Sequence, residues 1–244
     1  MKIFKEVFGR IWALWGLLSF VTTFFIIFIP SMLCYLIPGK KGQDIFIAIS
    51  RIWMKFWLTI IGCPVIVTGK KYFEKNIAYI VTYNHNALLD VPLSAPCIPA
   101  GNKTIAKTSF AKIPFFGWYY RKGSVLVDRN NDASRRKSFD EMKEVLKQGI
   151  HMCIYPEGTR NRTNDPLKKF YAGAFKLAVD TKTPVMPAVI FNTKKAMPIH
   201  KKFYLWPCRL RLDFLPPVDA TNISADELKD KVFQIMWDQY EANQ

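Results

Sequence analysis

Metal-binding and redox-active residues are scarce in this sequence and show no motif spacing. It has three histidines (His85, His151 and His200) and five cysteines, without an HExxH motif or a CxxC pair. We therefore expect no metal site built from side chains. An odd number of dispersed cysteines is typical of buried thiols in a reducing compartment rather than of a disulfide framework.

Acidic residues are also few, because 19 Asp and Glu stand against 35 Lys and Arg, for a formal net charge of +16. This excess favours a polyanionic partner: nucleic acid, an anionic membrane surface or a phosphorylated substrate. The sequence contains no zinc-finger spacing, no helix-turn-helix pattern and no RNA-binding aromatic motif, so we expect no nucleic-acid partner. The long apolar N-terminus favours the membrane.

Charge is absent from residues 11–38, a run long enough to span a bilayer and too long for the core of a signal peptide. Pro30 is expected to interrupt it. Residues 44–61 follow as an aromatic, amphipathic segment in which Arg51 and Lys55 share one helical face. We predict a two-helix membrane anchor in domain 1–62, with the second helix near the bilayer surface. A single span followed by a core helix is the alternative.

Domain 63–244 alternates strand-like and helix-like segments, which predicts an α/β fold with a mainly parallel, mixed sheet flanked by helices. The prolines of segment 184–190 favour an edge or the start of a strand, and the alternation in 209–214 favours a half-exposed edge strand. The remaining predicted strands are 65–69, 77–83, a strand beginning at 104, 123–129 and 150–155. Predicted helices are 132–148, 171–180 and a last helix opened by a capping box at 224–227.

A histidine and a carboxylate follow the predicted strand 77–83, where α/β sheets usually place their chemistry. His85 and Asp90 are five residues apart, so neither one continuous helix nor one continuous strand brings them together. A turn at His85, followed by a helix that starts at Ala87 and is capped by Asn86, allows the contact. Asp90 then holds His85 in one tautomer as a general base. The alternative is an ordinary turn with a capping Asp.

A second group of functional candidates follows the predicted strand 150–155: Glu157, Gly158, Thr159 and Arg160. Gly158 permits close approach of the backbone to a ligand, and Arg160 can bind a phosphate through two parallel hydrogen bonds. The alternative is a surface turn in which Glu157 and Arg160 are solvated or paired with each other.

Four blocks in order resemble the motifs of the 1-acylglycerol-3-phosphate acyltransferases, also called lysophosphatidic acid acyltransferases. They are NHxxxxD at 84–90, a lysine, Pro-x-x-Gly turn and G-x-[IV]-x-[IV]-D-R strand within 107–129, EGTR at 157–160 and Val-Met-Pro at 185–187. Four ordered matches are far more specific than one. The chain departs from the pattern at Ala87, where many members carry a small hydroxyl residue, and at Asn161, where serine is usual.

The resemblance implies an enzyme that transfers an acyl group from acyl-CoA or acyl-carrier protein, without a cofactor, to the sn-2 hydroxyl of lysophosphatidic acid. His85 is implied to remove the hydroxyl proton, with Asp90 orienting it. Attack on the thioester is then direct, in agreement with the absence of a G-x-S-x-G motif. Backbone N–H groups at the start of the Ala87 helix are expected to stabilise the oxyanion.

Substrate binding is implied for the second group of candidates together with a lysine. Lys107 and Arg160 are implied to hold the acceptor phosphate, and Glu157 to brace Arg160 or contact glycerol. Gly158 and Thr159 complete the implied substrate-binding set.

The implied location is the inner (cytoplasmic) membrane, with the catalytic domain facing the cytoplasm. The implied partners are the phospholipid membrane, lysophosphatidic acid and the acyl donor. One alternative is an acyltransferase acting on glycerol 3-phosphate, lyso-ornithine lipid or another lysophospholipid. The other is a non-catalytic membrane protein that binds anionic lipid through its basic surface.

Overall fold

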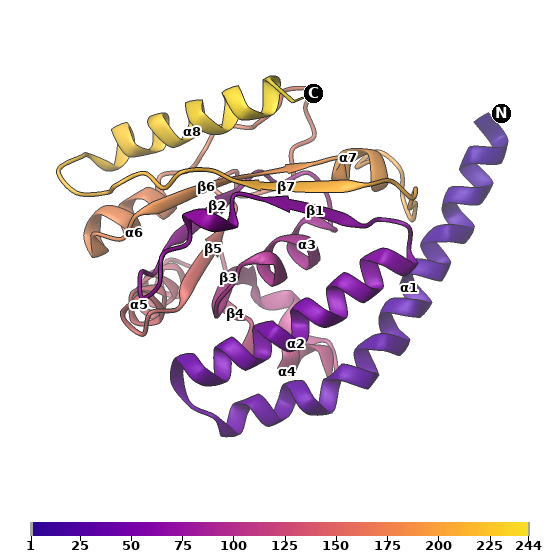
Figure 1. Ribbon diagram of the computed structural model, residues 1–244, viewed down its shortest axis with the longest axis horizontal. Helices are drawn as coiled ribbons and strands as arrows, with labels where there is room; N and C mark the ends of the chain where they lie inside the picture. The colour runs from indigo at the N-terminus through magenta and orange to yellow at the C-terminus, as the bar shows by residue number, and fades with distance from the viewer. Residues whose placement is uncertain (1, 244) are drawn as a thin grey trace.

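A seven-stranded sheet in the order β1-β7-β6-β2-β5-β3-β4 forms the centre of the fold (Figure 1). The computed structural model describes residues 2–243; Met1 and Gln244, the outermost residues of the two predicted domains, lie outside the described residues. Five strands run parallel from β6 to β4, whereas β7 is antiparallel to β6 and β1 is parallel to β7. The predicted α/β class with a mainly parallel, mixed sheet is confirmed.

The strands are β1 (Val65–Thr68), β2 (Ile80–Tyr83), β3 (Asn102–Lys107), β4 (Ser124–Val127), β5 (His151–Ile154), β6 (Val185–Phe191) and β7 (Leu210–Phe214). The α-helices are α1 (Lys2–Leu33), α2 (Gly39–Ile60), α3 (Asp90–Cys97), α4 (Phe116–Lys122), α5 (Asp132–Lys147), α6 (Gly173–Thr181), α7 (Thr193–Ala196) and α8 (Ala225–Glu241). Short 3-10 turns are η1 (Cys34–Leu36), η2 (Lys70–Tyr72) and η3 (Thr108–Lys112).

Helices cover both faces of this sheet. α5, α6 and α8 lie on one face, and α2 and α3 lie on the other, with α1 and α4 outside them (Figure 1). Successive side chains of a strand point to opposite faces, so Ile80 packs in the α5/α6/α8 layer and Val81 in the α2/α3 layer. β2, β5 and β6 are buried on both faces, and such strands need mostly apolar side chains, which explains their apolar runs in the sequence.

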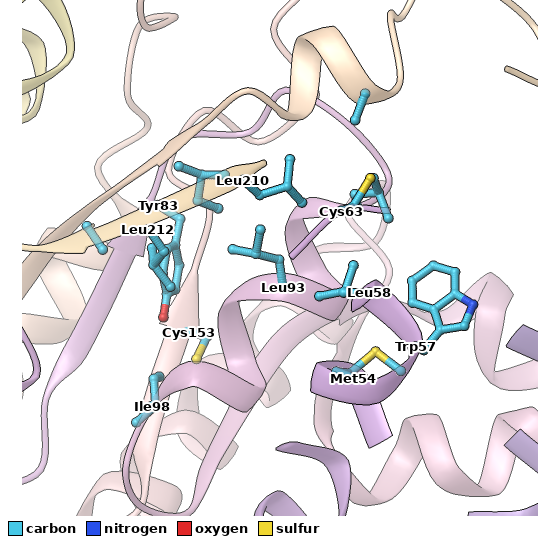
Figure 2. Packing of buried hydrophobic residues seen from close by; sticks show 14 of the residues in the cluster. Met54, Trp57, Leu58, Cys63, Tyr83, Leu93, Ile98, Cys153, Leu210 and Leu212 are labelled. Carbon is cyan, nitrogen blue, oxygen red and sulfur yellow. The ribbon is translucent and has the colours of Figure 1, made fainter. Parts of the chain in front are cut away.

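The second predicted anchor helix, α2, is built into the core. Leu93 of α3 lies between Leu58 of α2 and Leu210 and Leu212 of β7, and the four side chains are buried in one cluster (Figure 2). Trp57 of α2 belongs to the same cluster. α3 therefore connects α2 to the sheet by apolar packing, and α2 is not a helix lying free on a bilayer surface.

The prediction that Arg51 and Lys55 share a helical face toward the bilayer surface is wrong for Arg51, whereas Lys55 is exposed. The guanidinium of Arg51 donates to the carbonyl oxygens of Pro96 at 2.9 Å and Ile98 at 2.6 Å, at the end of α3. Its charge therefore points into the fold. Within residues 2–243, one helix, α1, is long and apolar enough by length and composition to cross a membrane. The anchor thus has one candidate helix rather than two.

α1 continues through Pro30, where the sequence predicted an interruption. A proline three residues before the helix end removes only one backbone hydrogen bond. Two indole N–H groups fasten α1 to α2: Trp12 donates to the Ile61 carbonyl at 2.9 Å, and Trp57 donates to that of Gly16 at 3.2 Å. The outer face of α1 exposes large apolar side chains along its length: Ile3, Phe4, Val7, Ile11, Leu14, Leu18, Phe25, Ile26, Ile29 and Leu33.

The edge position predicted for residues 209–214 is wrong, since β7 lies inside the sheet. For residues 184–190 the prolines favoured an edge or the start of a strand. β6 is not an edge strand, but Pro184 directly precedes its first residue, Val185, as the second alternative expects. Pro187 lies one residue before the β6–β7 ladder, which begins at the pair of Ala188 with Phe214, so its missing N–H interrupts no bond of that ladder. In β7, Asp213 is buried and forms an ion pair with Arg211. The charged alternation therefore marks an ion pair between a buried Asp213 and a partly exposed Arg211 rather than an edge strand.

Candidate active site

The candidate residues gather where the strand order reverses. From β2 the chain passes through α3 toward β3 on one side, and from the adjacent β5 it passes through α6 to β6 on the other side. A crevice forms at the carboxyl ends of such neighbouring strands, and ligands of open α/β sheets bind there. His85 follows β2 and Glu157 follows β5, so both lie at this point.

The turn after β2 differs from its prediction. α3 begins at Asp90 rather than Ala87, and Asn86 does not cap it. The Asp90 side chain instead reaches back, and its Oδ2 accepts the backbone N–H groups of Asn86 at 2.5 Å and Ala87 at 2.7 Å. These two N–H groups were expected to face an oxyanion, and that expectation is wrong because both are bound to Asp90.

His85 and Asp90 are in contact across this turn. The Nδ1 atom of His85 lies 2.8 Å from Asp90 Oδ2, and the Asp90 side chain is fully buried. A carboxylate oxygen accepts hydrogen bonds, so Nδ1 carries the proton and Nε2 has the free lone pair. The ring of Tyr155 packs against His85 with 4.6 Å between centroids, and its hydroxyl pairs with Ser94 at 2.6 Å. The imidazole is therefore held in one tautomer and one orientation.

Glu157 holds His85 from the opposite side, through the main chain. Its Oε1 accepts the His85 N–H at 2.9 Å, and its Oε2 accepts the Lys168 N–H at 3.3 Å. Burial raises the pKa of Glu157 from 4.5 to about 7, although both backbone hydrogen bonds act to lower it. Glu157 was expected to brace Arg160 or contact glycerol; its contacts are instead with the backbone beneath the site.

Asn161, where the motif usually has serine, is fully buried and organises the loop after β5. Its N–H donates to the His85 carbonyl at 2.6 Å. Its side-chain oxygen accepts the Thr163 N–H at 2.9 Å, and its amide donates to the Asp165 carbonyl at 2.9 Å. Both backbone polar groups of His85 are thus bound to the loop that follows β5.

One cavity of about 720 Å³ connects His85 with most of the predicted binding residues. Lys107, Gly158, Thr159 and Arg160 line it, whereas Asp90 and Glu157 lie behind its wall. Gly158 has φ of +69°, a left-handed conformation that favours glycine.

Three further cations line the same cavity and were not selected from the sequence: Arg129, Arg162 and Lys168. Arg129 donates to the Gly158 carbonyl, and the Lys168 ammonium donates to Thr159 Oγ1 at 2.7 Å. The position of Arg129 at the end of a predicted strand was a usable signal. Lys168 follows no strand, so no comparable signal existed for it.

We call the part of the cavity lined by its five cationic side chains the basic mouth: Lys107, Arg129, Arg160, Arg162 and Lys168. Away from it, the cavity continues as an apolar arm between α2, α3, α4 and β3. Its walls include Phe46, Trp53, Met54 and Pro96. The hydroxyls of Ser50 and Tyr119 also line it, but they bind each other at 2.7 Å, so neither demands a polar ligand. In the described part of the chain, no three His, Cys, Asp or Glu side chains gather as a metal site.

Comparison with known proteins gives the same family as the sequence motifs. The sequence model of the acyltransferase family matches residues 64–191. A protein of Saccharomyces cerevisiae named 1-acyl-sn-glycerol-3-phosphate acyltransferase is 29% identical over 82% of this chain and 66% of its own length. A protein of the same name from Cocos nucifera is 33% identical over 75% of this chain and 58% of its own. The chain thus spans less than two thirds of these relatives.

The fold is shared with a solved structure. The crystal structure of the 1-acyl-sn-glycerophosphate acyltransferase PlsC of Thermotoga maritima superposes with a TM-score of 0.81 at 24% identity, covering 98% of this chain and 97% of that one. At this identity the likeness establishes the fold alone. The family match extends over more than half of the chain, from β1 to the end of β6, and includes all four motifs. The resemblance predicted from the motifs is therefore confirmed, and the chain belongs to the acyltransferase family.

Proposed function

We propose that this protein is a membrane-attached acyltransferase that acylates the sn-2 hydroxyl of 1-acyl-sn-glycerol 3-phosphate to give phosphatidic acid. One observation carries the proposal: His85 lies in a single cavity that has five cationic side chains at one end and an apolar arm at the other. A lysophosphatidic acid has a phosphate and an acyl chain joined by the glycerol that bears the reacting hydroxyl. The two ends of the cavity match the two ends of this substrate class.

In the proposed reaction, His85 Nε2 takes the proton of the sn-2 hydroxyl as its oxygen attacks the thioester carbonyl of acyl-CoA or acyl-carrier protein. A carbon–oxygen bond forms, the carbon–sulfur bond breaks, and the departing thiolate takes the proton from His85. Asp90 keeps Nδ1 protonated and stabilises the imidazolium. No cofactor takes part in these steps.

Positioning is assigned to the basic mouth. Arg160 and Lys107 bind the acceptor phosphate, and this fixes the glycerol hydroxyl near His85. Gly158 and Thr159 form the adjoining wall. A hydroxyl and a general base that are held in this way react within one complex instead of by collision. In ideal cases this lowers the activation free energy by roughly 7–11 kcal/mol.

Membrane attachment is assigned to the exposed apolar face of α1, which brings the cavity to the bilayer where the amphiphilic acceptor resides. We place the catalytic domain on the cytoplasmic side of the inner membrane, where the acyl donors are available.

An acceptor panel with one acyl donor tests the proposal. The purified full chain is given acyl-CoA with lysophosphatidic acid, glycerol 3-phosphate, a lyso-ornithine lipid or lysophosphatidylcholine, and thiol release is followed with the His85→Ala variant as the blank. We expect the highest kcat/KM with lysophosphatidic acid. Turnover on another acceptor but not on lysophosphatidic acid would overturn the acceptor assignment. Absence of turnover with every acceptor, using acyl-CoA and then acyl-carrier protein, would overturn the enzymatic role.

A further inference from the structure

An aromatic hairpin of two short helical elements, η3 and α4 (residues 108–122), connects the parallel strands β3 and β4 and lies next to α1. Its inner side chains, Phe110 among them, line the cavity described above, whereas Ile113, Phe115 and Trp118 do not. Four of its large side chains are largely exposed: Ile113, Phe115 and Trp118, at 46%, 49% and 57%, and Phe110, at 43%. Exposed apolar side chains concentrated in one short segment mark an interaction surface. The hairpin thus needs a partner that the rest of the fold does not supply.

The hairpin is held in a strained backbone conformation. Phe115 has φ of +59° and ψ of −54°, and the Phe116 N–H donates to the Pro114 carbonyl at 2.6 Å, which closes a γ-turn. A γ-turn with positive φ is rare and strained for a residue other than glycine. The turn is fixed from behind, because Gly117 donates to the Ile113 carbonyl at 2.7 Å. The strain therefore serves to hold the Phe115 ring in an outward position.

The Phe115 ring continues the apolar face of α1. It packs edge-on against Phe25 and Phe28 of α1 at 5.9 Å and 5.8 Å between centroids, and Trp118 stacks on Phe28. The Tyr35 hydroxyl donates to the Trp118 carbonyl at 2.8 Å, which ties the hairpin to the end of the α1 segment. A bilayer that receives the outer face of α1 therefore meets the hairpin at the same depth.

A small groove of about 220 Å³ lies on the hairpin and carries two positive charges. Lys112 and Arg121 line it together with Phe115 and Trp118, and no acidic side chain is among its described lining residues. One guanidinium nitrogen of Arg121 donates to the Ala111 carbonyl at 3.3 Å, which orients that side chain. Cations beside exposed aromatic rings match the boundary between lipid headgroups and acyl chains.

We infer that this hairpin inserts into the bilayer beside α1, with Lys112 and Arg121 binding the phosphate of an anionic phospholipid. The inference rests on the membrane attachment proposed above but not on the chemistry. It adds a lipid contact beside the C-terminal half of α1, at Phe25 and Phe28, whereas the indole hydrogen bonds of Trp12 and Trp57 join α1 to α2 nearer its N-terminus. It also predicts that attachment depends on lipid charge.

Vesicle binding by the full chain tests this inference. Binding to phosphatidylcholine vesicles with and without phosphatidylglycerol is measured by flotation for the wild type and the Lys112→Ala/Arg121→Ala variant. Each of the two cations near an anionic surface contributes about fivefold, so we expect roughly 25-fold weaker binding to the anionic vesicles and little change on phosphatidylcholine alone. The control is Lys176→Ala/Lys231→Ala, which removes two exposed lysines from α6 and α8 on the opposite face of the sheet.

The aromatic contact is tested by Phe115→Gly, which removes the ring and suits the positive φ, so the variant keeps its fold. Thermal unfolding checks that fold, and we expect roughly tenfold weaker binding to both kinds of vesicle.

Retained preference for anionic vesicles in the Lys112/Arg121 variant, or an equal loss in the lysine control, would overturn the headgroup site. Unchanged binding by Phe115→Gly would overturn the insertion. If the wild-type protein binds neither kind of vesicle, both the inference and the proposed membrane attachment are overturned. Acyl transfer in detergent micelles reports on the chemistry separately and is expected to stay within about twofold in all of these variants.

Discussion

The carboxylate of Glu157 accepts the backbone N–H of His85 at 2.9 Å, although 72 positions separate the two residues in the chain. Glu157 is fully buried and does not line the cavity. It therefore acts on His85 by fixing the backbone, while Asp90 fixes the imidazole. Two acidic residues from different strand ends thus fix the histidine, one through its backbone and the other through its side chain.

Replacing His85 by alanine is expected to lower kcat by roughly 10²–10⁴-fold, the usual contribution of a general base. His200, which is exposed, serves as the matched control, and His200→Ala should keep wild-type turnover. Initial rates of thiol release from acyl-CoA measure both variants. Full activity in a folded His85→Ala protein would remove the general base from the mechanism.

The pKa of Glu157 makes stability depend on pH. Its pKa is 4.5 when unfolded and about 7 in the fold, because burial disfavours the charged form. The folded state thus binds the proton more tightly, so the contribution of Glu157 to stability is complete below about pH 4.5 and is lost as pH rises to about 7. A difference of this size corresponds to about 3 kcal/mol.

We compare the free energy of unfolding of the wild type and Glu157→Gln by denaturant titration across this range. The stability of the wild type relative to the variant should decrease from about pH 5 to about pH 7 and then stay constant. A difference that is flat with pH would mean that Glu157 titrates normally. A difference that rises with pH would mean that its hydrogen bonds outweigh its burial.

Replacing Arg160 by alanine is expected to raise the KM for lysophosphatidic acid roughly tenfold to a hundredfold, because a charge-assisted hydrogen bond contributes about 1.5–3 kcal/mol. The KM for the acyl donor should change little. Arg136, an exposed arginine on α5 outside the cavity, is the control for a general loss of charge. A KM effect on the donor alone would place the donor phosphates, not the acceptor, on Arg160.

Gly158→Ala is expected to destabilise the protein by about 1 kcal/mol, because φ of +69° is unfavourable for alanine. The new Cβ would also approach a ring carbon of Tyr171 to 2.8 Å, but this exposed side chain can move. Gly173→Ala is the matched control, since its Cβ meets no atom within 4 Å and a helical site favours alanine. Denaturant unfolding of both variants gives the difference; equal stabilities would show that the Gly158 backbone relaxes.

The sequence predicted where the candidate site lies, because its residues follow strand ends and strands are marked by short apolar runs. It also predicted the His85–Asp90 contact, since that contact is local. It did not predict the hydrogen bond between Glu157 and the His85 backbone, or those of the Arg51 guanidinium with the end of α3. These hydrogen bonds join segments whose order in space the apolar pattern does not encode. The same limit explains β6 and β7: a proline or an alternating pattern describes a strand's chemistry, whereas its neighbours depend on the topology of the whole sheet.

The packing of α1 and α2, joined by the indole hydrogen bonds of Trp12 and Trp57, has a practical consequence for preparing this protein. Trp53, Trp57 and Leu58 of α2 are part of the core that also contains Leu93 and Leu212. Deleting the first 62 residues to obtain a fragment that is soluble without detergent would remove α1 and α2 from one face of the sheet. The apolar side chains of that face would then be exposed to water. Solubility is better sought by replacing apolar residues on the outer surface of α1, which leaves the interior closed.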